Sequence, residues 1–387
     1  MSIDIDALLK KAVQMKASDL HVKAGSHPVV RIDGELSALH DEKKFSTEDT
    51  FSIASAVMNE FHMEEFKKTH DIDVAYGIAG QARFRCNCYT QRGSVSLVFR
   101  HISADILDIE ELYLPVVLKK IALEPRGLIL VTGTTGSGKS TSLASMIDYI
   151  NANKTYNIIT IEDPIEFLHT DKNSIVSQRE IGSDTDTFSK ALRAALRQDP
   201  DVILVGEMRD FETVQTALLA AETGHLVLST LHTADAVETI NRVISVFPPY
   251  QHKQVRTQLA SVLRSIISMR LVPRADETGR VPAVEVLMAT ATIKGCIEEA
   301  EKTNQINEHV AEGFSQYGMQ TFDQSLYSLY KKGLITYEDA LNRSSNPDDF
   351  ALKVKGVSST KDTYTDDGNI LGDSNDEKGP EIERFSS

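Results

Sequence analysis

The stretch GLILVTGTTGSGKST, residues 127–141, joins an uninterrupted apolar run to a glycine-rich segment that ends in Lys-Ser-Thr. Residues 133–140 match the pattern G-x-x-x-x-G-K-[ST], in which loop amides and a helix N-terminus surround phosphate groups. The apolar run predicts a buried strand, and the residues after Lys139 have helical periodicity. Because the pattern leaves a strand and enters a helix, it predicts a phosphate-binding loop rather than a simple glycine turn.

The loop residues have specific expected roles in binding ATP and Mg²⁺. Lys139 is predicted to neutralise the β and γ phosphates, and the Ser140 hydroxyl is predicted to ligate Mg²⁺. The residues predicted to bind the nucleotide are Gly133, Thr134, Thr135, Gly136, Ser137, Gly138, Lys139, Ser140 and Thr141.

Three more apolar runs follow and alternate with helical patterns: NIITIED (157–163), DVILVGE (201–207) and HLVLSTLH (225–232). Runs without polar alternation indicate strands buried on both faces, and therefore a parallel sheet flanked by helices. We predict an α/β domain of the RecA-like type. In that arrangement we expect the strand at 157–163 to be inserted between the phosphate-loop strand and the strand at 201–207.

Acidic residues end two of these strands. Glu207 is predicted to contact Mg²⁺ directly or through water, as an acid at the end of such a strand does. TIEDPIEFLH (160–169) places Glu162, Asp163 and Glu166 at the same sheet edge, where ligands bind. A carboxylate there can orient and deprotonate the attacking water. The alternative is an acidic surface turn.

His232 follows the fourth strand and is expected at the same edge. An imidazole there can sense or stabilise the γ-phosphate, whereas the alternative is a structural histidine with satisfied hydrogen bonds.

Arginines occupy one face of two predicted strands near the N-terminus. ARFRCNCY (82–89) alternates so that Phe84, Cys86 and Cys88 share one face, and Arg83 and Arg85 the other. Arg100 follows on the next strand. These side chains form either a solvated basic face or an arginine finger that reaches a nucleotide held by another domain or subunit.

The chain divides by composition into four parts. Residues 1–102 predict a small α+β domain with helices at 5–15 and 47–61; residues 103–117 form a linker; and residues 118–355 form the ATPase domain with C-terminal helices, including one at 254–270. From Gly356 to Ser387 there are eight acidic and three basic residues, a composition that predicts a disordered acidic tail.

Charge and cysteine content exclude several classes of protein. A net charge of −15 disfavours binding to nucleic acid or to an anionic membrane surface. No apolar run approaches the ~18 residues of a transmembrane helix, and the N-terminus lacks the features of a signal peptide. Three cysteines without a CxxC pair disfavour a structural zinc site and, without an export signal, predict a cytoplasmic protein.

Four sequence boxes in order resemble the secretion and type IV pilus ATPases, most closely the retraction ATPases PilT and PilU. GTTGSGKST is similar to the family's Walker A box, TIEDPIEFLH to its aspartate box, RQDPDVILVGEMRD to its Walker B box and TGHLVLSTLHTADA to its histidine box. GMQTFDQSLYSLYKKGLITYEDAL and SSNPDDFAL resemble the C-terminal region of that subgroup. The likeness covers residues 1–355.

The resemblance implies specific roles and an assembly. Glu166 corresponds to the general base, Glu207 to the Walker B acid and His232 to the γ-phosphate contact, while Arg83, Arg85 and Arg100 match the arginine-bearing strands. It also implies a PAS-like N-terminal domain and a RecA-like C-terminal domain. The expected protein is a homohexameric, cytoplasmic ATP hydrolase that powers pilus retraction and twitching motility. It would associate peripherally with the inner membrane through a platform protein of the pilus machine.

Alternatives within and outside the family remain open. The stretch ATIKGCIEEAEK (291–302) keeps a helical pattern but lacks the arginines of the retraction-ATPase sequence AIRNLIRE. This difference, with the acidic tail, keeps an accessory role of the PilU type beside a PilT paralogue open as an alternative. A pilus-extension or type II secretion ATPase usually has a longer N-terminal region and a four-cysteine zinc module. A nucleic-acid translocase and a nucleotide-binding adaptor with little turnover are further alternatives.

Overall fold

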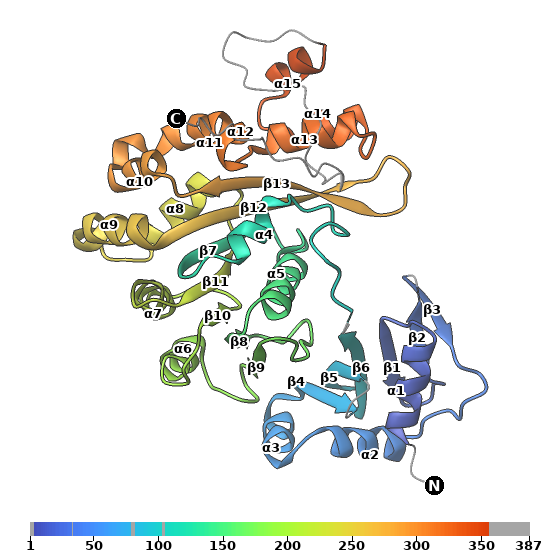
Figure 1. The fold of residues 1–387 in the computed structure, drawn as a ribbon. Helices are drawn as coiled ribbons and strands as arrows, with labels where there is room; N and C mark the ends of the chain where they lie inside the picture. Colours follow the sequence, from blue (N-terminus) through green and yellow to red (C-terminus); the bar gives the residue numbers. More distant parts are fainter. Residues whose placement is uncertain (1–3, 33, 79–81, 103–104, 356–387) are drawn as a thin grey trace, which may run out of the picture. The chain divides into compact units, whose positions relative to one another are not determined.

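The computed structural model describes residues 4–32, 34–78, 82–102 and 105–355 of the 387-residue chain (Figure 1). They divide into two compact units. The first contains the residues up to Ile106 together with Asn151–Glu207, and the second contains Leu107–Ile150 together with the residues from Met208 onward. The predicted tail at 356–387 lies outside the described residues, and the predicted domain boundaries stay predictions.

The first unit begins with a six-stranded antiparallel sheet and three helices. The strand order is β3-β2-β1-β6-β5-β4. The strands are β1 (Asp19–Lys23), β2 (Val29–Ile32), β3 (Glu35–Ala38), β4 (Asp71–Ile78), β5 (Ala82–Gln91) and β6 (Ser94–Ile102). The helices are α1 (Ile5–Gln14), α2 (Thr47–Val57) and α3 (Glu60–Thr69). This is the α+β arrangement that the sequence predicted.

Two helices replace the single helix predicted over residues 47–61. Met58 adopts an extended conformation, and the side chain of Asn59 accepts a hydrogen bond from the backbone N–H of His62 at 2.8 Å. An asparagine at this position caps a new helix because it satisfies an N–H that has no partner within the helix. The periodicity continued across the break and concealed it.

The burial pattern along β5 confirms the predicted division of its faces. Phe84, Cys86 and Cys88 are buried, whereas Arg85 is exposed. The two sulfur atoms lie 3.6 Å apart, and burial raises the pKa of the Cys86 thiol. Both cysteines therefore belong to the core, as predicted.

Phe99 on β6 lies at the centre of this core, and its replacement should be costly. Its side chain is 0% exposed, and its ring meets those of Phe84 and Tyr76 edge to face, with centroids 6.4 and 6.2 Å away. We expect Phe99→Ala to lower the free energy of unfolding by about 3–5 kcal/mol, measured by urea denaturation. Phe51→Ala is the matched control, because that ring is 53% exposed. A similar loss in both variants would contradict the assignment of Phe99 to the core.

The second sheet is mainly parallel and has the strand order β13-β12-β7-β11-β10-β8-β9. Its strands are β7 (Gly127–Thr132), β8 (Asn157–Glu162), β9 (Ile175–Glu180), β10 (Val202–Val205), β11 (Leu226–Leu231), β12 (Leu263–Pro273) and β13 (Arg280–Met288). β13 runs antiparallel to β12, whereas β12, β7 and β11 are parallel to one another and so are β10, β8 and β9. The helices that connect these strands are α5 (Lys139–Asn153), α6 (Phe188–Ala195), α7 (Phe211–Glu222), α8 (Ala236–Ser245), η1 (Pro249–Gln251) and α9 (His252–Val262).

Two predictions about this sheet are wrong. The strand between β7 and β10 is β11, not the predicted strand at 157–163, which is β8 and lies on the other side of β10. The helix predicted over 254–270 ends at Val262, and the rest of it belongs to β12. There the chain enters a sheet interior, where pairing with β7 and β13 outweighs the helical pattern of the preceding residues.

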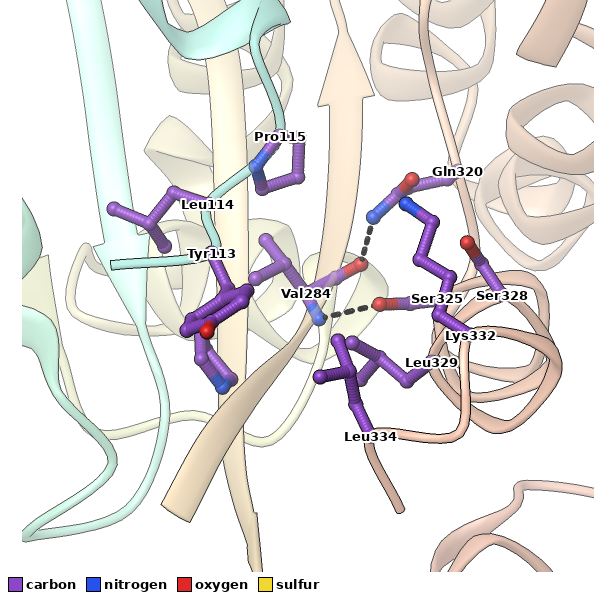
Figure 2. Close-up of a pocket in the computed structure, with 11 residues that line it drawn as sticks. Tyr113, Leu114, Pro115, Val284, Gln320, Ser325, Ser328, Leu329, Lys332 and Leu334 are labelled. Atoms are coloured by element: carbon purple, nitrogen blue, oxygen red, sulfur yellow. Dashed lines mark hydrogen bonds between the residues drawn. The ribbon is translucent and has the colours of Figure 1, made fainter. Parts of the chain in front are cut away.

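Short helices complete the second unit. They are α4 (Val117–Ala122), α10 (Ala291–Glu298), η2 (Ala300–Gln305), α11 (Ile306–Glu312), α12 (Phe314–Tyr317), α13 (Phe322–Lys331), α14 (Tyr337–Arg343) and α15 (Pro347–Val354). Beside β13, Tyr113, Leu114 and Pro115 line a small cavity with residues of α13 (Figure 2). Its volume of about 30 Å³ is enough for one water molecule, so this cavity does not hold a nucleotide.

Candidate active site: a phosphate loop and a carboxylate cluster

The phosphate loop connects the buried strand β7 to helix α5 in the second unit. Every residue of β7 is buried. Gly133 has a φ of +139°, and a Cβ atom there would lie 2.5 Å from both the carbonyl oxygen of Met269 and the hydroxyl of Ser137. The loop therefore requires glycine at its first position, because a side chain would meet β12.

Lys139 and Ser137 place polar side-chain groups against the backbone of the loop. The Lys139 side chain is buried, and its Nζ donates to the carbonyl oxygens of Gly133 and Thr134 at 2.8 and 2.9 Å. The buried hydroxyl oxygen of Ser137 has no hydrogen-bond partner among the described residues. A phosphate oxygen fits such a set of groups, since it accepts from ammonium, hydroxyl and backbone N–H donors together.

His232 lies beside this loop, as the sequence predicted. β11 pairs with β7 in parallel, with Leu231 opposite Thr132, so that His232 and Gly133 follow neighbouring strands at the same edge. His232 is exposed. The next residue, Thr233, is buried and shares a 2.6 Å hydrogen bond with Thr239 of α8. The segment is thereby attached to the helix that follows it.

The acidic residues of the aspartate and Walker B boxes follow two neighbouring strands in the first unit. β8 and β10 pair in parallel, with Ile161 opposite Val205, so Glu166 and Glu207 both follow neighbouring strands at one edge. Glu166 is exposed and Glu207 is half-buried. An exposed carboxylate is accessible to a water molecule, which a general base requires.

Glu162 differs from Glu166 because it is half-buried and its carboxylate is hydrogen-bonded. It accepts hydrogen bonds from Thr160 Oγ1 at 2.6 Å and from Gln178 Nε2 at 3.2 Å. Burial raises the pKa of Glu162, while these hydrogen bonds oppose that shift. The bond from Gln178 ties the end of β8 to β9.

Gln178 and Glu180 of β9 are part of this site, and the sequence did not indicate them. The Gln178 side chain accepts from the backbone N–H of His169 and donates to the carbonyl of Phe167, at 2.8 and 2.9 Å. Glu180 is buried and accepts from the backbone N–H of Ile165 at 3.2 Å. Both residues hold the segment that carries Glu166. The run IVSQRE (175–180) carries no motif that would have indicated this role.

Each candidate arginine pairs with a carboxylate of its own chain. Arg83 donates to Glu180 at 3.1 Å, Arg85 to Asp73 at 3.2 Å and Arg100 to Asp19 at 2.9 Å. Arg85 and Arg100 are largely exposed, whereas Arg83 is half-buried. The role of one of these arginines as a finger stays a prediction.

Ser140 and Glu207 each offer an oxygen of the kind that Mg²⁺ binds beside a nucleotide. No group of three or more His, Cys, Asp or Glu side chains among the described residues could hold a metal alone. Mg²⁺ in such enzymes binds through one or two protein oxygens, with waters and phosphate oxygens as the other ligands. The hydroxyl of Ser140 and the carboxylate of Glu207 are oxygen donors of this kind. Among the residues that the structure describes, no helix has the length and apolar composition needed to span a membrane.

A glycine-rich loop between a buried strand and a helix, in a mainly parallel sheet with acidic strand ends, defines a P-loop nucleotide-binding protein. Residues 1–315 match the sequence model of the type II/IV secretion system protein family. The chain belongs to this family, which confirms the resemblance and the predicted fold class.

Individual relatives are similar over most of their length. The type IV pilus retraction ATPase PilT of Pseudomonas aeruginosa is 44% identical over 348 residues, which is 90% of this chain and 100% of PilT. The type IV pilus ATPase PilU of the same organism is 42% identical over 353 residues, 91% of this chain and 92% of PilU. A crystal structure of the pilus retraction motor PilT with bound ADP has a TM-score of 0.82 and 49% identity, covering 90% of this chain and 98% of that one.

The close packing of Gly133 predicts the effect of a single methyl group. We expect Gly133→Ala to weaken ADP binding about tenfold or more, because its Cβ would displace the loop from β12. Gly295→Ala in α10 is the matched control, since a Cβ there meets nothing within 4 Å and alanine favours a helix by about 0.5–1 kcal/mol. Titration with a fluorescent ADP analogue measures both; equal affinities would contradict the packing argument.

Proposed function

We propose that this chain is a Mg²⁺-dependent ATP hydrolase that works as a hexameric motor of type IV pilus retraction. The observation that carries the proposal is the phosphate loop with Lys139 against its carbonyl oxygens, in a chain that covers the whole length of a PilT retraction ATPase at 44% identity. The direct test is expression in a strain that lacks its own retraction ATPase. Twitching motility should return with the wild type and not with Lys139→Ala.

The residues divide the chemistry among them. Lys139 and the loop amides neutralise the phosphates, and Ser140 and Glu207 hold Mg²⁺, which polarises the γ-phosphate when bound. Glu166 orients and deprotonates the attacking water, and His232 contacts the γ-phosphate. The strand order supports this division, because the boxes that carry these residues follow parallel strands of one sheet.

Glu166 should be required for turnover but not for binding. We expect Glu166→Ala to bind ATP within about threefold of the wild-type affinity and to lose roughly 10²–10⁴ in kcat, the usual contribution of a general base. A phosphate-release assay and a nucleotide titration measure the two quantities. Glu64→Ala, which removes an exposed carboxylate from α3, should change neither. Near-normal turnover of Glu166→Ala would remove Glu166 from this role.

The proposed assembly is a homohexamer in which an arginine of one subunit reaches the nucleotide of its neighbour. Arg85 and Arg100 have exposed side chains on the β4–β6 face of the first unit, which is consistent with contact in trans. The ring would act at the cytoplasmic base of the pilus through an inner-membrane platform protein.

An accessory motor of the PilU type is the second candidate function. It is favoured by 42% identity to PilU over 91% of this chain and by helix α10, whose sequence lacks arginine. We expect the chain to hydrolyse ATP alone, with less than a fivefold increase when a PilT partner carrying a disabled phosphate loop is added. Stimulation of about fivefold or more, within the range of allosteric coupling, would favour the accessory role.

A further inference from the structure

A row of buried polar residues crosses the sheet of the second unit next to the phosphate loop. In the strand register Thr132 of β7 lies opposite Ser268 of β12, and Ser268 lies opposite Glu285 of β13. Their exposed fractions are 0%, 0% and 4%. Burying such groups costs free energy unless they bond to one another, so their contacts require an explanation.

Hydrogen bonds connect this row into one chain. Thr132 Oγ1 donates to Ser268 Oγ at 3.1 Å, and Ser268 Oγ donates to Glu285 Oε2 at 3.0 Å. The same carboxylate oxygen accepts the backbone N–H of Ala236 at 2.7 Å. Ala236 is the first residue of α8 and lies four residues after His232. The chain of bonds therefore joins the strand that enters the phosphate loop to the helix that follows His232.

The strand that carries Glu285 is itself fixed by the C-terminal helices. The backbone N–H of Val284 donates to Ser325 Oγ at 3.0 Å, and Gln320 Nε2 donates to the Val284 carbonyl at 2.7 Å, as Figure 2 shows. The backbone of Val286 pairs with that of Gln320 in both directions. Glu285 thus projects from a strand that is anchored on both sides of it.

We infer that Glu285 is a positioning residue for ATP hydrolysis. Its carboxylate holds the first turn of α8, and with it the His232 segment, at a fixed place relative to the phosphate loop, through Ser268 and Thr132. The inference rests on the proposed roles of Lys139 and His232. Glu285 acts on these groups through its neighbours.

The charge of Glu285 changes within the physiological pH range. Burial raises the pKa of this carboxyl to about 7, and the bonds from Ala236 and Ser268 partly oppose the rise. Two nearby charged groups also act on this pKa. Asp235, which precedes α8, raises it, and Arg270 on β12 lowers it. An ionised carboxylate accepts hydrogen bonds more strongly than a protonated one. The hydrogen bonds from Ala236 and Ser268 are therefore strongest when the carboxyl is ionised, above about pH 7.

The pH profile of turnover tests this role. Glu285→Gln keeps an oxygen that can accept both bonds but removes the titration. We expect kcat to rise from pH 6 to pH 8 in the wild type, and the rise to be smaller by about twofold or more in Glu285→Gln. Glu285→Ala, which leaves Ala236 N–H and the Ser268 hydroxyl unpaired, should lose roughly tenfold at every pH. Identical profiles of the wild type and Glu285→Gln would overturn the inference.

Two buried serines of β12 provide a matched comparison. Ser265 and Ser268 are both 0% exposed, and Ser265 Oγ donates to the carbonyl of Leu287 at 2.7 Å, outside the chain of bonds. Replacing either by alanine removes one buried hydroxyl bond. We expect Ser268→Ala to lower kcat and ADP affinity by about two- to thirtyfold, and Ser265→Ala to change each by less than twofold. Equal effects would show a purely structural role and overturn the inference.

Thermal melting without nucleotide separates this inference from the proposed function. Because the folded pKa of Glu285 exceeds the ordinary glutamate value, its contribution to stability is present at low pH and lost as pH rises through about 7. The difference between the Tm of Glu285→Gln and that of the wild type should therefore shift in favour of the variant as the pH rises from 5 to 8. A wild-type chain without ATP turnover would contradict the proposed function alone, provided that the serine variants still differ in ADP affinity.

Discussion

The pairing of β7 with β11 on one side and β12 on the other determines where the reactive groups of the second unit lie. In this register Leu231, Thr132 and Ser268 stand side by side on neighbouring strands. Because the side chains of a strand alternate with a period of two, a slip of one residue would reverse every side chain of β7. Such a slip would separate Thr132 from Ser268 and move Gly133 away from the carbonyl of Met269. The fit of the loop against β12 therefore depends on the register of β7.

The sequence predicted those parts of the site that local pattern determines. A buried parallel strand is a continuous apolar run, and a half-buried strand alternates between apolar and polar residues. These patterns predicted the phosphate loop, the strand ends that carry Glu207 and His232, and the alternation of β5. The strand order was not readable in this way. The position of β11 rather than β8 beside β7 depends on how the connecting helices pack on the sheet. The pattern of a single strand contains no information on this packing.

The sequence also did not reveal the residues that support the site from other elements. Gln178 and Glu180 come from an edge strand, and Ser268 and Glu285 from strands of which one was predicted as helix and the other not at all. Each is one polar residue in an otherwise unremarkable run. Only the register shows that it meets a backbone N–H or a hydroxyl of a distant segment. Such residues are recognised by the groups that they contact in the fold, and these groups lie far away in the sequence.

The acidic residues of this chain fall into two groups by solvation. Glu180 and Glu285 are buried and Glu162 is half-buried, and each accepts hydrogen bonds from side-chain or backbone donors of neighbouring segments. A buried carboxylate with such partners is strongly oriented, which suits it to fixing the position of a loop. Glu166 is instead exposed, within a segment that Gln178 and Glu180 hold. In the proposed mechanism the general base takes a proton from water in every cycle, which suits the exposed Glu166, while the buried Glu180 holds the backbone beside it.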